Sequence, residues 1–91
     1  MLPREQRVAE IRRRLDAAFS PASIEVIDDS HKHAGHEGAR DGRGHFTVHI
    51  SAAAFRGQSP LAQHRAIYEA LGELMSTDIH ALAIRSGAPA A

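Results

Sequence analysis

Residues 44–51 read Gly-His-Phe-Thr-Val-His-Ile-Ser and carry the clearest pattern in the chain. Phe46, Val48 and Ile50 alternate with polar residues. Apolar side chains at every second position are typical of a β-strand with one buried face. The sequence therefore predicts a half-buried strand here, and the partners of that strand must come from the segments before and after it.

A second strand is predicted upstream, from about Ser23 to Asp28. A polar, glycine-rich loop of some fifteen residues joins it to Gly44, so the simplest connection makes the two strands antiparallel. The loop begins Asp28-Asp29-Ser30-His31-Lys32-His33-Ala34-Gly35-His36, with three imidazoles and two carboxylates in nine residues. Long loops in small domains often carry function, and we expect this one to present a metal ligand.

An amphipathic helix is predicted from Arg4 to Phe19, where Val8, Ile11 and Leu15 follow one another at helical spacing. Ser20-Pro21 ends the helix, because the residue before a proline is disfavoured in helical torsions.

The run Arg12–Arg14 within this helix has two interpretations. It could contact phosphate, or it could form a solvated face paired with Glu10 and Asp16. The balanced net charge of the chain favours the solvated face.

Downstream, residues 52–55 are predicted to form a short helical turn. Ser59-Pro60 is typical of an N-cap followed by a first-turn proline, so a second main helix is expected from Pro60 to about Ser76. A third strand is expected from Ile79 to Arg85, parallel to residues 44–51. Its alternation places His80 in phase with Leu82, toward the covered side of the sheet unless a bulge turns it.

The fold class predicted is α+β, in the order helix-strand-strand-helix-strand. A three-stranded mixed sheet with both helices on one face buries all the apolar stripes. We expect a single domain over residues 1–91, with a core at about 4–86 and a frayed tail at 87–91.

Composition restricts the class of protein. The chain has 91 residues, 11 basic and 11 acidic, with 43% hydrophobic residues, so no global charge draws it to nucleic acid or anionic lipid. No stretch is apolar enough to span a membrane, and the start resembles no signal peptide. We therefore expect a soluble, cytoplasmic protein. It has seven histidines and no cysteine, so its own metal ligands must be imidazoles or carboxylates.

The histidines have alternative roles. In the loop, His31, His33 and His36 are either ligands or solvated polar residues. On the strand, His45 and His49 are about 13 Å apart by strand rise, too far for one metal, and a surface position is favoured for both.

Two histidines remain. His64 falls on the apolar stripe of the second helix, where partial burial is expected. His80 is either a histidine at the core edge or a ligand. Nothing in the sequence predicts an enzyme, because no serine elbow, His-Glu-x-x-His pair or phosphate-binding glycine loop is present.

Four blocks of the sequence, in order, resemble the BolA family: residues 28–36, Gly44-His45-Phe46-x-Val48, Phe55-x-Gly57-x-Ser59-Pro60-Leu61-x-x-His64-Arg65-x-x-Tyr68, and Ile79-His80-Ala81-Leu82-Ala83-Ile84. The resemblance spans about residues 8–85. It implies a fold related to the type II KH domain, in agreement with the order of elements predicted above.

The resemblance also implies a partner and a cofactor. BolA-like proteins form a heterodimer with a monothiol glutaredoxin that bridges a [2Fe-2S] cluster, for cluster trafficking or iron and redox regulation. The family's last-strand ligand matches His80, and its loop ligand matches His33 best, with His31 and His36 as alternatives. Glutaredoxin and glutathione supply the sulfur ligands. The isolated apo chain is then expected to hold no cofactor and to be a monomer or weak homodimer. Because imidazole ligation is lost on protonation, a labile, pH-sensitive cluster is expected.

The alternative implied by the resemblance is a DNA-binding transcriptional regulator of the stress response. Arg56 and Arg65 are the candidate nucleic-acid contacts. Against this, residues 55–58 hold only one glycine of the Gly-x-x-Gly loop with which KH domains clamp nucleotides, and the net charge is zero.

Overall fold

The structure is a computed structural model and describes residues 1–33 and 42–90. The order of its main elements is the one predicted from the sequence. The elements are α1 (Arg4–Phe19), β1 (Ala22–Asp28), η1 (Ser30–His33), β2 (Gly44–Ala52), η2 (Ala53–Phe55), α3 (Pro60–Leu71), α4 (Leu74–Thr77) and β3 (Ile79–Gly87).

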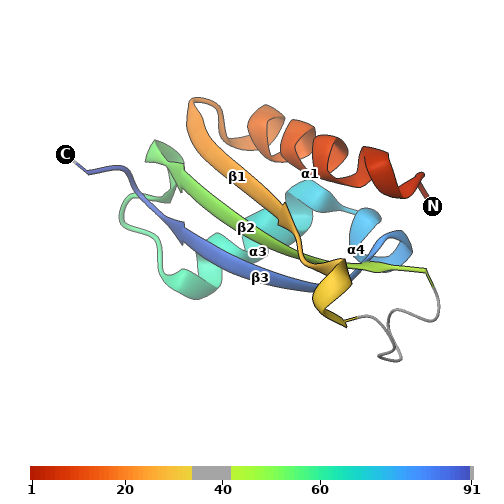
Figure 1. Cartoon of the computed structure of the whole chain (residues 1–91). Helices are drawn as coiled ribbons and strands as arrows, with labels where there is room; N and C mark the ends of the chain where they lie inside the picture. The colour runs from red at the N-terminus through yellow and green to blue at the C-terminus, as the bar shows by residue number, and fades with distance from the viewer. Residues whose placement is uncertain (34–41, 91) are drawn as a thin grey trace.

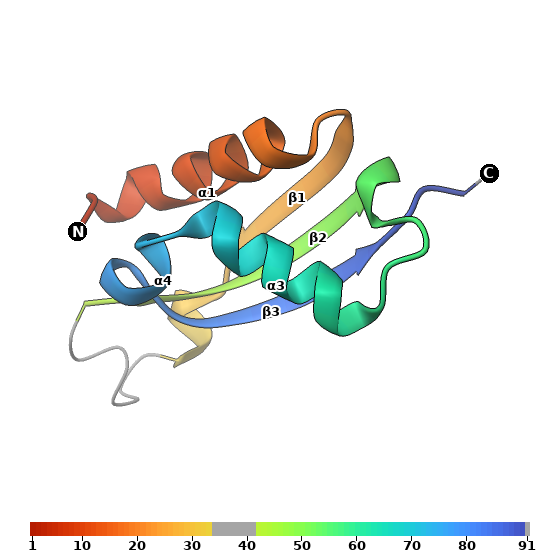
Figure 2. The ribbon, with the colours of Figure 1, turned by 180° about the vertical axis from the view of Figure 1, so that it is seen from behind.

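The three strands form one mixed sheet in the order β1-β2-β3 (Figure 1). β1 is antiparallel to β2, and β2 is parallel to β3. Viewed from behind, α1 and α3 cover the same face of the sheet (Figure 2). The predicted fold class is confirmed, and within residues 1–33 and 42–90 the other sheet face carries no α-helix.

The core lies between the two helices and the sheet. Ile11 and Leu15 of α1, Val48 of β2 and Ile67 of α3 are all at most 1% exposed. Burial of such side chains is the main favourable term in folding. The half-buried strand predicted from the alternation of residues 44–51 is therefore confirmed, because its apolar positions face the helices. The full buried apolar set is Ile11, Leu15, Phe19, Ile24, Phe46, Val48, Ile50, Ala52, Phe55, Ile67, Leu71, Leu74 and Ile79.

Two of the three arginines in the run Arg12–Arg14 form ion pairs with Glu10. Arg13 and Arg14 each lie 2.8 Å from its carboxylate. Their hydrogen bonds lower the pKa of Glu10 to about 2. Arg14 also donates to the carbonyl of Leu71 and pairs with Glu73, which ties α1 to the end of α3. The solvated, paired face is confirmed for Glu10, whereas the predicted partner Asp16 has no ion pair among the described residues.

The prediction of one helix from Pro60 to Ser76 is wrong, because α3 ends at Leu71 and α4 begins at Leu74. Gly72 between them has φ +55°, a left-handed conformation that glycine adopts without a side-chain clash. The predicted N-cap is confirmed, since the Ser59 hydroxyl accepts a hydrogen bond from the Ala62 N–H at 3.1 Å.

The C-terminal strand β3 runs to Gly87, two residues beyond the predicted end at Arg85 and into the segment expected to be a frayed tail. Beyond the strand, the carbonyl of Pro89 accepts a hydrogen bond from Arg56 at 2.9 Å. Among the helices that the structure describes, none has the length and apolarity needed to cross a membrane.

Candidate metal centre

His80 lies on a bulge at the start of β3. Gly44 pairs with Ile79 and the next residue, His45, pairs with Ala81, so His80 is the extra residue between the two pairs. Ile79 is 1% exposed and faces the core, while His80 is exposed. Simple alternation predicted the covered side for His80 unless a bulge turned it, and the structure contains that bulge. The bulge turns the imidazole out of the core.

His45 lies against His80. Their ring centroids are 5.0 Å apart with 46° between the planes. The backbone N–H of His45 donates to the Ser30 hydroxyl at 3.1 Å. The prediction of a surface position is wrong for His45, because the residue is only 7% exposed. Its position on the helix-free face is covered by its neighbours at this end of the sheet.

The first residues of the histidine loop are fixed to β2. The Asp29 N–H donates to the His45 carbonyl at 2.8 Å, and the Thr47 hydroxyl donates to the Asp29 carboxylate. The Ser30 N–H donates to the Asp28 carboxylate at 2.9 Å. These bonds hold η1 at the end of the sheet where β2 and β3 begin (Figure 1).

The three loop histidines that were predicted as candidate ligands lie in different parts of the loop. His31 is exposed in η1, and His33 is the last residue of that short helix. His36 lies outside the described residues. The structure thus places the backbone of His31 and His33 in a segment that is fixed to the same end of the sheet as His80.

Gly44 permits the close contact between η1 and β2. A Cβ atom at this position would lie 2.7 Å from the Phe46 ring and 2.8 Å from the Ser30 hydroxyl oxygen. Both distances are below van der Waals contact, so any larger residue must displace the ring or the start of η1. The absence of a side chain here is what lets Ser30 reach the backbone of His45.

Asp78 fixes the turn that leads into His80. Its carboxylate, 2% exposed, accepts hydrogen bonds from the Leu2 N–H at 2.8 Å, the Arg7 guanidinium at 3.0 Å and the Thr77 hydroxyl at 2.6 Å. Its backbone carbonyl accepts from the Gly44 N–H at 2.8 Å. Burial raises the pKa of Asp78, but the bonds from Thr77, Leu2 and Arg7 outweigh burial, and the net pKa is lowered. His80 therefore projects from a fixed backbone.

The ion pair between Arg7 and Asp78 was not predicted from the sequence. A signal was present, because Arg7 lies four residues before Ile11 and eight before Leu15, on the apolar stripe of α1. A charged residue in that phase needs a buried partner. Within residues 1–33 and 42–90, no group of three or more His, Cys, Asp or Glu side chains is placed to hold a metal ion.

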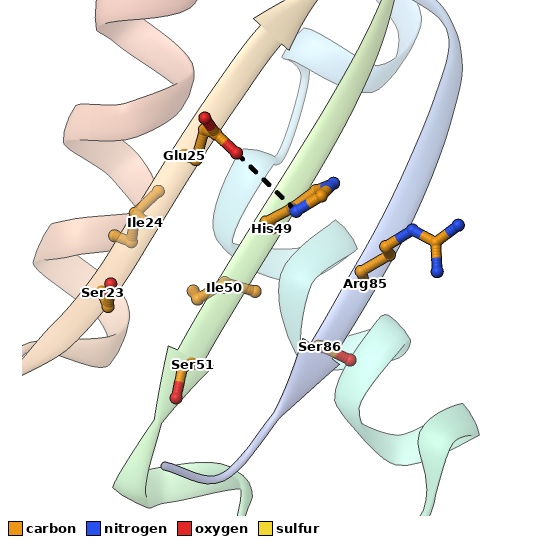
Figure 3. Close-up of a pocket in the computed structure, with 8 residues that line it drawn as sticks. All are labelled: Ser23, Ile24, Glu25, His49, Ile50, Ser51, Arg85 and Ser86. Atoms are coloured by element: carbon orange, nitrogen blue, oxygen red, sulfur yellow. Dashed lines mark ion pairs between the residues drawn. The ribbon is translucent and has the colours of Figure 1, made fainter. Parts of the chain in front are cut away.

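A polar hollow of about 460 Å³ lies on the helix-free sheet face (Figure 3). Glu25, His49 and Arg85 line it from three paired positions on adjacent strands. His49 Nδ1 is 3.7 Å from the Glu25 carboxylate, a contact that becomes an ion pair when the imidazole is protonated. The predicted surface position of His49 is confirmed, and so is the partial burial of His64 on α3.

The two arginines predicted to contact nucleic acid are both exposed. Arg65 lies on α3, and Arg56 follows η2. Arg56 is occupied by its hydrogen bond to the Pro89 carbonyl.

Comparison with known proteins identifies the family. The sequence matches the profile of a family described as "BolA-like protein" over residues 15–91. It is 43% identical over 81 residues to an "Uncharacterized protein in cobS 5'region" of Sinorhizobium, which covers 87% of each chain. It is 40% identical over 76 residues to the "DNA-binding transcriptional regulator BolA" of Escherichia coli K12, covering 84% of this chain and 70% of that protein.

The fold is also similar to solved structures. The BolA domain of SufE1 from Arabidopsis thaliana superposes with a TM-score of 0.80 at 35% identity, over 98% of this chain and 96% of that domain. The chain spans only 23% of the whole Arabidopsis SufE-like protein 1 and 58% of mouse BolA-like protein 1. The chain belongs to the BolA-like family.

Proposed function

We propose that this chain is a non-enzymatic iron-sulfur adaptor, which binds a monothiol glutaredoxin and co-ligates a bridging [2Fe-2S] cluster. The observation that carries the proposal is the bulge at His80. Without the extra residue, the imidazole would point toward the core. With it, the ring is exposed at the end of the sheet where the histidine loop begins.

The donor set fits such a cluster. Imidazole replaces thiolate on one iron of Rieske-type [2Fe-2S] centres, which raises the reduction potential. The chain has seven histidines and no cysteine, so the thiolate ligands are assigned to the glutaredoxin and to glutathione. His80 is the ligand from β3. His33 is the preferred ligand from the loop, with His31 and His36 as alternatives.

The other residues of the site have supporting roles. Asp78 fixes the backbone before His80 through three hydrogen bonds to its carboxylate. His45 lies beside the His80 ring and restricts the space into which that ring can turn. Ser30 and Asp29 hold the start of the loop on β2. This arrangement limits the conformational freedom of the ligands before the cluster binds. Less conformational entropy is therefore lost on ligation.

The test is anaerobic reconstitution with a monothiol glutaredoxin, iron, sulfide and glutathione, followed by visible absorption and circular dichroism. The wild type is expected to shift the spectrum away from that of the glutaredoxin homodimer, and His80→Ala to abolish the shift. His49→Ala is the matched control, because His49 is a partly exposed histidine on the same sheet face, four residues along β2 from His45.

The loop ligand is identified in the same experiment. His33→Ala is expected to abolish the shift, whereas His31→Ala and His36→Ala are expected to retain it. Far-ultraviolet circular dichroism of each apo variant shows whether the fold persists. If the wild type leaves the glutaredoxin spectrum unchanged, or if His80→Ala behaves like the wild type, the adaptor proposal is wrong.

DNA binding is the second candidate function, supported by the name of the Escherichia coli relative and by the exposed Arg65 on α3. A gel-shift titration over a range of salt concentrations separates the two functions. A protein that contacts phosphates loses affinity steeply as salt rises. Arg65→Ala should then weaken binding and reduce the salt slope. Absence of binding at low salt would exclude this function.

A further inference from the structure

A row of charged side chains crosses the helix-free face of the sheet. Glu25 pairs with His49 across β1 and β2, and His49 pairs with Arg85 across β2 and β3. Residues that are directly opposite each other on neighbouring strands share one face of a sheet. Among the described elements no α-helix covers this face, so a ligand from solvent can reach all three side chains (Figure 3).

The charged row stands among uncharged neighbours. The adjacent rows on this face are Ser23, Ser51 and Gly87 on one side and Ile27, Thr47 and Ala83 on the other. The short side chains of the serine row, next to the long ones of the charged row, leave the hollow of about 460 Å³. A Cβ atom added at Gly87 would meet no atom within 4 Å, so the sheet is open at this end of the row.

Protonation of His49 decides the charge of the row. The Glu25 carboxylate and the Arg85 guanidinium cancel each other, so a protonated imidazole makes the row positive. Its Nδ1 atom lies 3.7 Å from the Glu25 carboxylate. A protonated imidazole donates from both ring nitrogens, and Nε2 lies on the side of the ring toward β3 (Figure 3). The side chain is 44% exposed, so a ligand can reach Nε2.

Arg85 supplies a second cationic donor. Within residues 1–33 and 42–90 its guanidinium takes part in no ion pair, in contrast to Arg7, Arg13 and Arg14. The planar fork of N–H groups matches the oxygens of a phosphate or a carboxylate. The hydroxyl groups of the two serines in the hollow, residues 23 and 51, add further donors.

This set of donors selects the chemical class of the ligand. A metal ion is disfavoured, because Arg85 repels cations and Glu25 and His49 alone are too few ligands. A carboxylate has two oxygens, whereas a phosphate group has three terminal oxygens and so can use the arginine fork, the imidazole and a hydroxyl together. Nucleic-acid binding depends on several phosphate contacts, and one isolated charged row offers one.

We propose that this hollow binds a single phosphate group, either inorganic phosphate or a small phosphomonoester, and that protonation of His49 strengthens the binding. Arg85 and His49 Nε2 donate to the terminal oxygens, and the serine hydroxyls complete the contacts. Glu25 accepts from Nδ1 and thereby orients the imidazole. This site is separate from the proposed cluster site, because neither His80 nor a loop histidine lines the hollow.

The test is an NMR titration of the ¹⁵N-labelled protein with inorganic phosphate and with phenyl phosphate, at constant pH and ionic strength. The amide signals of residues 23–25, 49–51 and 85–86 should shift and reach saturation. Tighter binding of phenyl phosphate would identify an ester as the ligand, and equal binding would identify phosphate itself. Acetate is the control anion and should bind more weakly than either.

The variants separate the site from general charge. Arg85→Met should weaken phosphate binding by about tenfold, because charge-assisted hydrogen bonds are lost. Arg4→Met is the matched control, since Arg4 is an exposed arginine of α1, on the opposite side of the sheet (Figure 2). It should leave the affinity unchanged. The amide spectrum of each variant shows whether its fold persists.

The role of His49 is measured by the pH dependence of binding. A phosphate ester itself takes up a proton at about pH 6, so sulfate, whose charge stays constant, is the probe for this series. The wild type should bind sulfate more tightly at about pH 5 than at about pH 8. His49→Gln should reduce this difference, whereas His64→Gln, which changes a half-buried histidine of α3 outside the hollow, should retain it.

Four outcomes would overturn the proposal. The signals of the hollow could fail to shift with either phosphate probe. Acetate could bind as tightly as phosphate, which would leave a general anion effect. Arg85→Met and Arg4→Met could lose affinity equally, which would assign binding to net charge. His49→Gln could keep the pH dependence of the wild type, which would refute the role of protonation.

Discussion

Replacing Arg7 by methionine tests the buried contact that supports the His80 turn. Arg7 Nε lies 3.0 Å from the Asp78 carboxylate, and the two side chains are 4% and 3% exposed. Methionine keeps the apolar stem of the arginine but removes the charge. The Asp78 carboxylate then remains buried, with the Leu2 N–H and the Thr77 hydroxyl as its donors.

The expected cost follows from burial. Removing one partner of a buried ion pair destabilises proteins by about 3–5 kcal/mol, because the other charge stays buried. Because Asp78 keeps two hydrogen-bond donors, we expect Arg7→Met to destabilise the fold by about 3 kcal/mol, near the lower end of this range. For a domain of this size, such a loss lowers the thermal midpoint by roughly 12–24 °C. Arg7→Met combined with Asp78→Asn removes both charges and should recover part of the loss.

The assay is urea unfolding followed by circular dichroism at neutral pH, on the wild type, both single variants and the double variant. A double-mutant cycle should give a coupling free energy of about 1–3 kcal/mol. Arg13→Met is the control, because Arg13 is an exposed arginine of the same helix, also paired with a carboxylate, and should change stability little. The reasoning would be refuted if the free-energy changes of the two single variants were additive. It would also be refuted if Arg7→Met were no more destabilising than Arg13→Met.

Three further predictions concern stability. Gly44→Ala should lower the free energy of unfolding by about 1–3 kcal/mol, because the added Cβ overpacks this site. Gly87→Ala should be nearly neutral, since no atom lies near its added Cβ. Equal thermal midpoints for the two variants would contradict the close contact described at Gly44. The pKa of Asp78 is lowered below its ordinary 3.8, so its stabilising contribution is present above that pH and is lost as the pH falls. Urea titrations at about pH 5 and about pH 3 should therefore show a larger loss of unfolding free energy for the wild type than for the Arg7→Met/Asp78→Asn variant. Equal losses would argue against a stabilising role of the Asp78 carboxylate. Ser59→Ala should cost about 1 kcal/mol by removing the N-cap of α3, and an unchanged unfolding midpoint would show that the cap contributes nothing.

The sequence predicted the elements well where a local pattern determines them. The stripe of Ile11 and Leu15, closed by Pro21, placed α1 at its observed bounds. The alternation around Val48 gave β2 and its buried face. Gly72 was harder, because a glycine inside a helix costs only about 1 kcal/mol, so local pattern alone does not decide between an interrupted and a continuous helix. In the structure, Arg14 of α1 caps the carbonyl of Leu71, a contact distant in sequence.

The candidate site was predictable in its residue types but not in its geometry. His80 changes face because one residue is inserted in the β2–β3 register, and no alternation within β3 alone reveals that insertion. His45 is buried because Ser30 and the His80 ring lie against it, although its strand phase is that of a solvent-facing residue. Both outcomes depend on contacts between segments that are far apart in the chain.

Buried charge lies close to this site. Arg7 and Asp78 are the two buried charged residues among the described ones. Arg7 lies on α1, and its guanidinium contacts Asp78 in the turn that precedes His80. A buried ion pair is commonly no more stabilising than apolar residues of similar volume, so stability alone explains its position poorly. Under the proposed adaptor function, the pair fixes the backbone from which His80 projects.

The double variant separates the two roles. If the pair serves stability alone, Arg7→Met/Asp78→Asn should give the same glutaredoxin-dependent spectrum as the wild type at a temperature where both are folded. If the pair also positions His80, the spectral shift should be weaker, or the cluster should be lost faster, although the fold is intact. His80→Ala defines the spectrum without this ligand, and we expect the double variant to fall between it and the wild type.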